Sequence, residues 1–308
     1  MPASPPIDTL VVIGVGLIGG SFALALRERG CVRRVVGVGR TRANLDAALG
    51  VGAIDVGFTL DEDWTAAMID AELVVLAAPV AQYPGLLAQL APHLGADTLV
   101  TDTGSTKQDV VAAARATLGK ALPRFVPGHP VAGSERTGAA AADARLYEGR
   151  EVILTPSDVT AAAAQTRVAA VWEAVGARVS VMTPAAHDRL LATVSHVPHL
   201  IAFALMDLVA RRADATELLS HAGSGLRDTT RIAASSPEMW RDIALANRHA
   251  VQEQLAAYRQ VLDEIAGALA RGDGGALMAT FARAAAVRRA WTGAPTYPHA
   301  STAGENDA

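Results

Sequence analysis

Residues 11–21 read VVIGVGLIGGS, an apolar β-branched run followed at once by glycines in the spacing GxGxxG. In a strand–turn–helix unit of this kind, Gly14 permits a tight turn and Gly16 lets the backbone approach a pyrophosphate. Gly19 lets the helix pack closely on the strand, and the pyrophosphate then lies on free amides at the helix N-terminus. The stretch therefore predicts a dinucleotide-binding domain at the start of the chain.

Short β-branched runs alternate with helical patterns as far as residue 183, and continuous apolar strands separated by helices predict a parallel sheet covered on both faces. The expected strands are Thr9–Ile13, Arg34–Val38, Leu73–Ala77, Thr98–Thr101, Arg124–Val126, Glu151–Leu154 and Arg178–Val181.

Beyond residue 184 the apolar residues recur at spacings of three and four, which predicts helices. Pro198 should kink the first helix because it lacks an amide donor. A second helix should begin at Ser236-Pro237 and run through Ile265, and a last one should span 276–291. The fold class predicted is α/β. A Rossmann-type parallel-sheet domain (8–183) is followed by an all-helical substrate and dimerisation domain (184–291), and a tail (292–308) is expected to be disordered.

The end of the second strand bears on the choice between NAD and NADP. NAD sites usually carry an acid there, whereas this chain reads GVGRTR at 37–42, with two arginines and no acid. Arginine suits a 2′-phosphate, so the pattern favours NADP and leaves NAD open. The expected cofactor contacts are Gly14, Gly16, Leu17, Ile18, Gly19, Arg40, Thr41, Arg42, Ala78, Pro79 and Asp102.

Composition excludes several classes of protein. The net charge of −4 offers no basic surface for nucleic acid. Cys31 is the single cysteine, so no intrachain disulfide forms. The N-terminus lacks the pattern of a secretory signal, and the apolar runs are interrupted before membrane-spanning length, so we expect a cytoplasmic protein that binds no membrane. The helical region is small for its apolar content, which favours a homodimer formed through it.

Polar residues follow two of the expected strands, where ligands gather in a parallel sheet. Ser105 lies after the fourth strand, where it is either a site hydroxyl or a helix cap. His129 lies between Gly128 and Pro130 in what we expect to be a rigid loop, and it is a candidate general base. His196 and His199 are spaced by three, but with no acid or thiol to complete a metal site we predict none.

Several segments together resemble the prephenate/arogenate (cyclohexadienyl) dehydrogenase family. They are GVGLIGGS, DTGSTK, GHPVAGSE, ILTP, SHVPH, GSGLRDTTRIA and PEMWRDI, in family order. The resemblance implies that His129 accepts the proton, or a strong hydrogen bond, from the ring hydroxyl of the substrate and that Ser105 contacts the same hydroxyl. It further implies that a substrate carboxylate binds Arg231 and that the pocket is shaped by His196, His199, Trp240, Ser134 and Glu135.

The expected reaction is oxidative decarboxylation of prephenate to 4-hydroxyphenylpyruvate, of arogenate to tyrosine, or of both, with reduction of NAD(P) in tyrosine biosynthesis. One alternative is a hydroxyacid or imine reductase of similar plan, which would need a lysine or aspartate donor on the helical domain. The segment 187–207 contains no lysine, which counts against it. A second alternative is a non-catalytic NADP-sensing protein, in which His129 would be dispensable.

Overall fold

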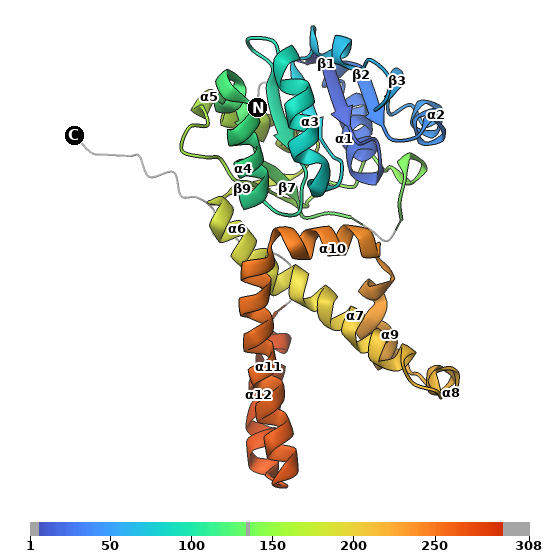
Figure 1. The fold of residues 1–308 in the computed structure, drawn as a ribbon, viewed down its shortest axis with the longest axis vertical. Helices are drawn as coiled ribbons and strands as arrows, with labels where there is room; N and C mark the ends of the chain where they lie inside the picture. The colour runs from blue at the N-terminus through green and yellow to red at the C-terminus, as the bar shows by residue number, and fades with distance from the viewer. Residues whose placement is uncertain (1–5, 134–135, 292–308) are drawn as a thin grey trace, which may run out of the picture. The chain divides into compact units, whose positions relative to one another are not determined.

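Parallel strands form the central sheet of the first domain, as expected. The computed structural model describes residues 6–133 and 136–291. Six strands follow the order β3-β2-β1-β4-β5-β6, and every neighbouring pair is parallel (Figure 1). The strand order reverses between β1 and β4, where a doubly wound sheet opens a ligand crevice at its carboxyl edge. The strands are β1 (Ile7–Ile13), β2 (Val32–Gly39), β3 (Val56–Thr59), β4 (Leu73–Leu76), β5 (Leu99–Asp102) and β6 (Phe125–Val126).

Helices cover both faces of this sheet and bury two apolar clusters. One face packs against α1 (Leu17–Glu28), α2 (Arg42–Gly50) and α5 (Ala162–Ala174). The other packs against α3 (Tyr83–Leu90) and α4 (Gln108–Thr117). Short 3-10 segments connect these elements, namely η1 (Thr65–Met68), η2 (Val80–Gln82), η3 (Ala91–His93), η4 (Gly119–Arg124) and η5 (Ala139–Ala141).

The structure corrects the expected sheet in two respects. The edge strand β3 was missed because its residues are only half-buried and include Gly57, which weakens the strand pattern. The last two expected strands, Glu151–Leu154 and Arg178–Val181, belong to a second sheet and not to the parallel one. This sheet has the order β7-β8-β9 and is made of β7 (Gly128–Pro130), β8 (Glu151–Leu154) and β9 (Arg178–Val181). In this sheet β7 is antiparallel to β8, and His129 pairs with Ile153. His129 therefore lies in a short strand, not in the loop that the sequence predicted.

The helical region also differs in detail from the expectation. A π-helical turn, η6, precedes Pro198, so the kink expected at this proline is a widened turn. The helix expected from Ser236 to Ile265 is divided at Asn247, whose buried side chain is hydrogen-bonded elsewhere. The elements are α6 (Pro184–Leu191), η6 (Ala192–His196), α7 (Val197–Ala210), α8 (Ala215–Ser220), α9 (Ser224–Thr230), η7 (Arg231–Ala234), α10 (Pro237–Ala246), α11 (Arg248–Ala270) and α12 (Gly274–Ala290).

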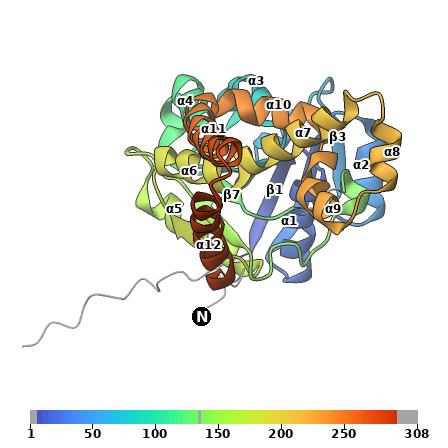
Figure 2. The same ribbon diagram turned by 90° about the horizontal axis from the view of Figure 1, so that it is seen from below.

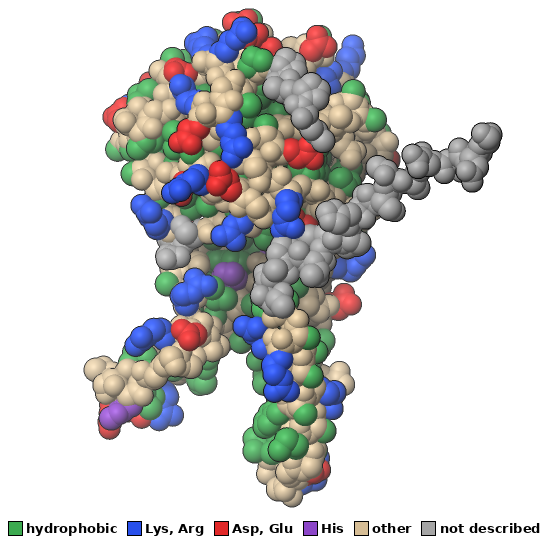
Figure 3. Space-filling view, turned by 180° about the vertical axis from the view of Figure 1, so that it is seen from behind, with side chains coloured by type: hydrophobic (Ala, Val, Ile, Leu, Met, Phe, Trp, Pro, Cys, Tyr) green, Lys and Arg blue, Asp and Glu red, His purple; other side chains and the backbone are tan. Residues whose placement is uncertain are grey.

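The chain forms two compact units, residues 1–254 and 255–308. The first contains both sheets, the helices through α10 and the start of α11. Figure 2, seen from below, shows α6, α7 and α10 lying across the α/β layers. The second contains α12 and most of α11, and the predicted disordered tail (292–308) lies outside the described residues. Hydrophobic side chains gather on the helices of the second unit (Figure 3), and they are 43% to 71% exposed: Val261, Leu262, Leu269, Met278, Phe281 and Val287.

The helical run Pro184–Ala210 passes a test of length and hydropathy for a membrane span, which the interrupted apolar runs did not lead us to expect. The run nevertheless carries His187 and Asp188, and Asp188 accepts a hydrogen bond from the Lys107 amide of the α/β domain. Core helices of soluble proteins share this length and composition, and the hydrogen bond from Lys107 attaches this helix to the α/β domain.

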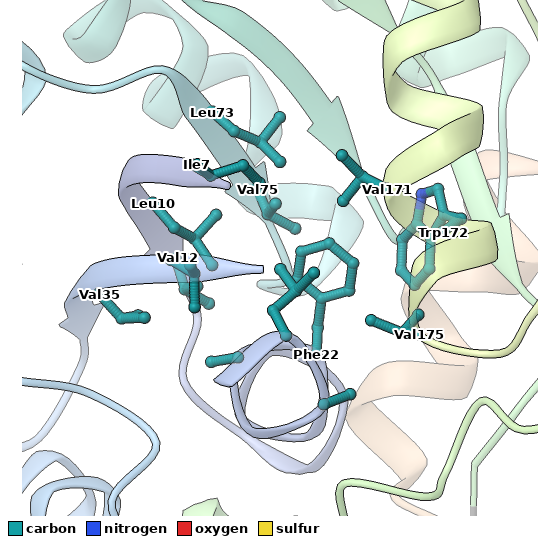
Figure 4. Packing of buried hydrophobic residues seen from close by; sticks show 14 of the residues in the cluster. Ile7, Leu10, Val12, Phe22, Val35, Leu73, Val75, Val171, Trp172 and Val175 are labelled. Carbon is teal, nitrogen blue, oxygen red and sulfur yellow. The ribbon is translucent and has the colours of Figure 1, made fainter. Parts of the chain in front are cut away.

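The larger apolar cluster centres on two aromatic rings. Phe22 of α1 and Trp172 of α5 have ring centroids 4.4 Å apart, and Figure 4 shows them between the two helices and the apolar side chains of β1 and β4. Both residues have 0% exposure. This contact fixes α1, and therefore the glycine turn that precedes it, against the sheet.

Replacing Trp172 with alanine should lower the free energy of unfolding by about 3–5 kcal/mol, because it leaves a cavity in a close-packed core. Denaturant unfolding followed by circular dichroism measures the change. The matched control is Ile69→Ala, since Ile69 is 75% exposed and its loss should cost less than about 0.5 kcal/mol. Equal effects of the two substitutions would contradict the packing described here.

Candidate active site

The glycine turn after β1 has the geometry that a dinucleotide needs. Gly14 adopts φ +102°, and a Cβ at this position would lie 2.5 Å from the Ala77 backbone. A Cβ at Gly19 would lie 2.3 Å from the Gly14 carbonyl oxygen, whereas Gly16 faces open space. No side chain caps α1, so the amides of its first turn, including those of Leu17 and Ile18, stay available for an anion. These residues fit a pyrophosphate.

Two further expected cofactor contacts border this turn. Ala78 and Pro79 directly follow β4, and the Ala78 amide nitrogen lies 2.6 Å from where a Cβ of Gly14 would be. Ala78 is half-buried and Pro79 is exposed. The structure therefore brings both to the crevice between β1 and β4.

The three residues after β2 have different surroundings. Thr41 caps α2 by accepting a hydrogen bond from the Asn44 amide. Arg42 donates to both carboxylate oxygens of Glu62, at 2.7 and 2.6 Å, and to the Gly57 carbonyl at 2.9 Å. Arg40 is exposed and forms no ion pair with any residue in the described part of the chain. Of the two arginines, only Arg40 keeps its guanidinium available to a ligand.

A buried ion pair at the carboxyl end of β5 also holds the segment that follows β6. Lys107 and Asp102 are both 0% exposed, and Lys107 Nζ donates to Asp102 Oδ2. Lys107 Nζ also donates to the Gly128 carbonyl at 2.7 Å, and Asp102 accepts from the amides of Gly104 (2.7 Å) and Gly128 (3.0 Å). Asp102 was expected to contact the cofactor, but its carboxylate is enclosed and engaged by protein groups. Its side chain instead holds the segments that carry Ser105 and His129.

His129 begins a chain of hydrogen bonds through buried side chains. Its Nδ1 lies 2.8 Å from His187 Nε2, and His187 Nδ1 lies 2.8 Å from Asp188 Oδ1. Asp188 also accepts from the amides of Lys107 (2.8 Å) and Gln108 (2.9 Å) at the start of α4. Burial holds the pKa of His129 well below its usual value, so the ring is neutral near pH 7.

The substrate residues expected from the helical region form a cluster. His199 stacks on Trp240, with centroids 3.6 Å apart and planes at 20°, and the His196 ring lies 6.1 Å from Trp240. The main chain of Ser105 lies beside His196. Burial lowers the pKa of His196 to about 4, so His196 is neutral at pH 7.

Arg231 adds a positive charge to this cluster, and Trp240 adds a hydrogen-bond donor. Burial lowers the pKa of His199, and the charge of nearby Arg231 lowers it further. Trp240 Nε1 is buried without a hydrogen-bond partner among the described residues. Buried N–H groups are almost always paired, so this one is suited to a polar group of a ligand. Ser134 and Glu135, also expected here, lie outside the described residues.

Several residues that support the site were not predicted from the sequence. His187 and Asp188 were not among the predicted site residues, and no group of three potential metal ligands occurs within residues 6–133 and 136–291. Asn247 donates to the Asp188 carbonyl at 2.7 Å and lies 3.1 Å from His196 Nδ1. The sequence did offer a signal for His187 and Asp188, because they form a polar pair within an apolar helical pattern. Nothing in the sequence distinguished Asn247.

Comparison with known proteins covers nearly the whole chain. Residues 22–181 match the family model "Prephenate dehydrogenase, nucleotide-binding domain", and residues 183–283 match "Prephenate dehydrogenase, dimerization domain". Prephenate dehydrogenase of Bacillus subtilis is 36% identical over 261 residues, which cover 84% of this chain and 69% of that protein. Cyclohexadienyl dehydrogenase of Zymomonas mobilis is 35% identical over 286 residues, which cover 91% of this chain and 95% of that protein.

A solved structure agrees with these matches. Prephenate dehydrogenase of Aquifex aeolicus, in complex with hydroxyphenyl propionate and NAD⁺, superimposes with a TM-score of 0.84 and 34% identity, covering 93% of this chain and 99% of that one. With the glycine turn, the buried histidine and the aromatic cluster all present within one compact unit, the chain belongs to the prephenate dehydrogenase family.

Proposed function

We propose that this chain oxidatively decarboxylates prephenate, arogenate or both, with reduction of a nicotinamide cofactor, in tyrosine biosynthesis. The observation that carries the proposal is that His129 and the Arg231–Trp240 cluster occur in the same compact unit as the dinucleotide turn. Family membership supports the same reaction. A purely NADP-sensing protein would have no use for a buried, hydrogen-bonded base.

The residues account for each requirement of the reaction. When bound, the nicotinamide accepts the hydride that leaves the carbinol carbon. His129 takes the hydroxyl proton at Nε2, and Ser105 contacts the same oxygen. The bond from the ring to the carboxylate then breaks, its electron pair completes an aromatic ring, and carbon dioxide leaves. The proton can return from His129 to the phenolate oxygen, so the base is regenerated.

The cluster around Trp240 suits the part of the substrate that does not react. Arg231 would bind a carboxylate through its forked guanidinium. The stacked His199 and Trp240 provide a flat apolar wall for the ring, and the Trp240 N–H supplies a donor to a polar substituent. When this cluster holds the unreactive part of the substrate, the hydroxyl is positioned against His129, and this orientation contributes to catalysis.

We propose that NADP is the preferred cofactor and that NAD also binds. The support is chemical: β2 ends at Gly39, where NAD sites usually carry an acid, and Arg40 follows it with its side chain exposed. The related Aquifex protein was solved with NAD⁺, which keeps NAD open.

We further propose a cytoplasmic homodimer formed through the helical domain. The match to a dimerization domain and the exposed apolar residues of α11 and α12 support the homodimer.

The proposed reaction is tested by incubating the purified protein with prephenate or arogenate and with NAD or NADP, in all four combinations. Reduced cofactor should form in step with carbon dioxide on at least one substrate. His129→Ala should lower turnover about a hundredfold or more. The control His93→Ala changes an exposed histidine of η3 and should leave turnover unaltered. No turnover in any combination would reject the function.

The pH dependence of kcat/KM follows from the pKa of His129. Because burial holds this pKa well below its usual value, the base form persists through pH 6.5. The rate should stay level as the pH falls through 6.5 and should decline only at lower pH, where the ring binds a proton. Steady-state rates between pH 4.5 and 8, with stability monitored at each pH, give the profile. A decline centred above pH 6.5 would contradict the buried base.

Arg40→Ala should raise the KM for NADP roughly tenfold or more and leave the KM for NAD unchanged, because a charged hydrogen bond contributes about 1.5–3 kcal/mol. Arg42→Ala is the matched control, since it removes an arginine already paired with Glu62 and should affect both cofactors alike. A larger NADP-specific loss in Arg42→Ala would assign the phosphate to that residue instead.

Phe281→Glu combined with Met278→Glu should shift the protein from dimer to monomer, because it places charges among apolar side chains that a second subunit would cover. Light scattering after size-exclusion chromatography measures the mass. Ile69→Glu alters an apolar residue of the α/β domain that is more exposed than Met278 and Phe281, and it should leave the dimer intact. A monomeric wild-type protein would refute the assembly.

A further inference from the structure

The buried chain His129–His187–Asp188 fixes where its protons lie. Each Asp188 oxygen accepts a backbone amide, from Lys107 at 2.8 Å and from Gln108 at 2.9 Å, as an ionised carboxylate does. Burial alone would raise the pKa of Asp188, but hydrogen bonds from His187 and from these two amides hold it below its usual value. Asp188 is therefore an acceptor, and His187 must donate its Nδ1 hydrogen to it.

The tautomers of the two histidines follow from this starting point. His187 is fully buried, and burial lowers its pKa, so the ring is neutral near pH 7 and carries one hydrogen. With that hydrogen on Nδ1, its Nε2 can only accept, and the partner at 2.8 Å is His129 Nδ1. His129 therefore carries its own hydrogen on Nδ1, which leaves Nε2 with a free lone pair.

We propose that His187 and Asp188 are positioning residues that hold His129 in the tautomer with an unprotonated Nε2 and stabilise the imidazolium formed when the substrate proton arrives. This inference rests on the proposed function for its catalytic part. The assignment of the tautomer does not depend on any substrate. The same logic operates in hydrolase triads, where a buried carboxylate orients a histidine and stabilises its cation.

The charges around His129 show why the carboxylate is needed. Burial disfavours a cation on His129 most strongly, and a positive charge on His187 or on Lys107, from the start of α4, disfavours it further. Lys107 is already paired with Asp102, so Asp102 is committed to another partner. Asp188 is the anion that reaches His129, through the shared ring of His187. Without it, a proton on Nε2 would place an uncompensated charge in a buried site, which is costly.

A purely structural role for Asp188 must be separated from this one, because the side chain also accepts the amides of Lys107 and Gln108 at the start of α4. Nitrogen-15 NMR of the histidine rings in the unliganded protein reports which ring nitrogen carries hydrogen, and His129→Gln identifies the His129 signals by their loss. In the wild-type protein we expect hydrogen on Nδ1 of His129 and none on Nε2. In Asp188→Asn, whose amide can donate to His187, the hydrogen on His129 should move to Nε2. Hydrogen on Nε2 in the wild type, or an unchanged tautomer in Asp188→Asn, would overturn the proposal.

A kinetic pair tests the catalytic part, with thermal unfolding measured for each variant. In His187→Gln the amide oxygen can still accept from His129 Nδ1, and turnover should stay within about tenfold of wild type. His187→Leu offers no acceptor and should lose about a hundredfold in kcat, with KM and cofactor affinity unchanged. Equal turnover of the two variants would overturn the positioning role. An inactive wild type would refute the proposed reaction, while the NMR measurement would still decide the tautomer.

Discussion

The buried pair of Lys107 and Asp102 is the interaction on which the rest of the site depends. Removing either partner would leave an unpaired charge in a fully enclosed position, an effect that commonly costs about 3–5 kcal/mol. The pair tolerates burial because further hydrogen bonds support both charges: Asp102 accepts two backbone amides and Lys107 donates to the Gly128 carbonyl. These bonds join the carboxyl end of β5 to the start of β7, so Ser105 and His129 are held by one set of contacts.

The same lysine links this pair to the helical region. Its main-chain amide, at the start of α4, donates to Asp188 of α6, and the Gln108 amide donates to the other carboxylate oxygen. A carboxylate is favoured at a helix N-terminus, where the amides lack partners within the helix. Asp188 thus joins the two domains and orients His187 in one arrangement. Asn247 adds a second link, from the break after α10 to the Asp188 carbonyl and to His196.

The sequence predicted what depends on local pattern and missed what depends on distant partners. The glycine turn, β1 and the helical character beyond residue 184 were predictable because period and turn chemistry determine them. The second sheet was not predictable from the sequence. Only Pro127 separates β6 from β7, and it is the pairing of His129 with Ile153 that shows the chain has changed sheets. His129 was found from its place after an expected strand, whereas the roles of Trp240 and Arg231 came from the family motifs. The role of Asp188 was not found, because its partners lie 80 and 81 residues away along the chain.

Burial makes His129 a weak base, whereas a general base works best when its pKa lies near the operating pH. The reaction relaxes this requirement. The hydroxyl becomes acidic only as hydride leaves its carbon, and aromatisation after loss of carbon dioxide makes the sequence irreversible. The base needs to hold the proton only until the phenolate can take it back. Burial keeps the ring neutral and ready, and the chain through His187 to Asp188 supports the transient cation, so a weak base in a rigid, dry setting meets the chemical need.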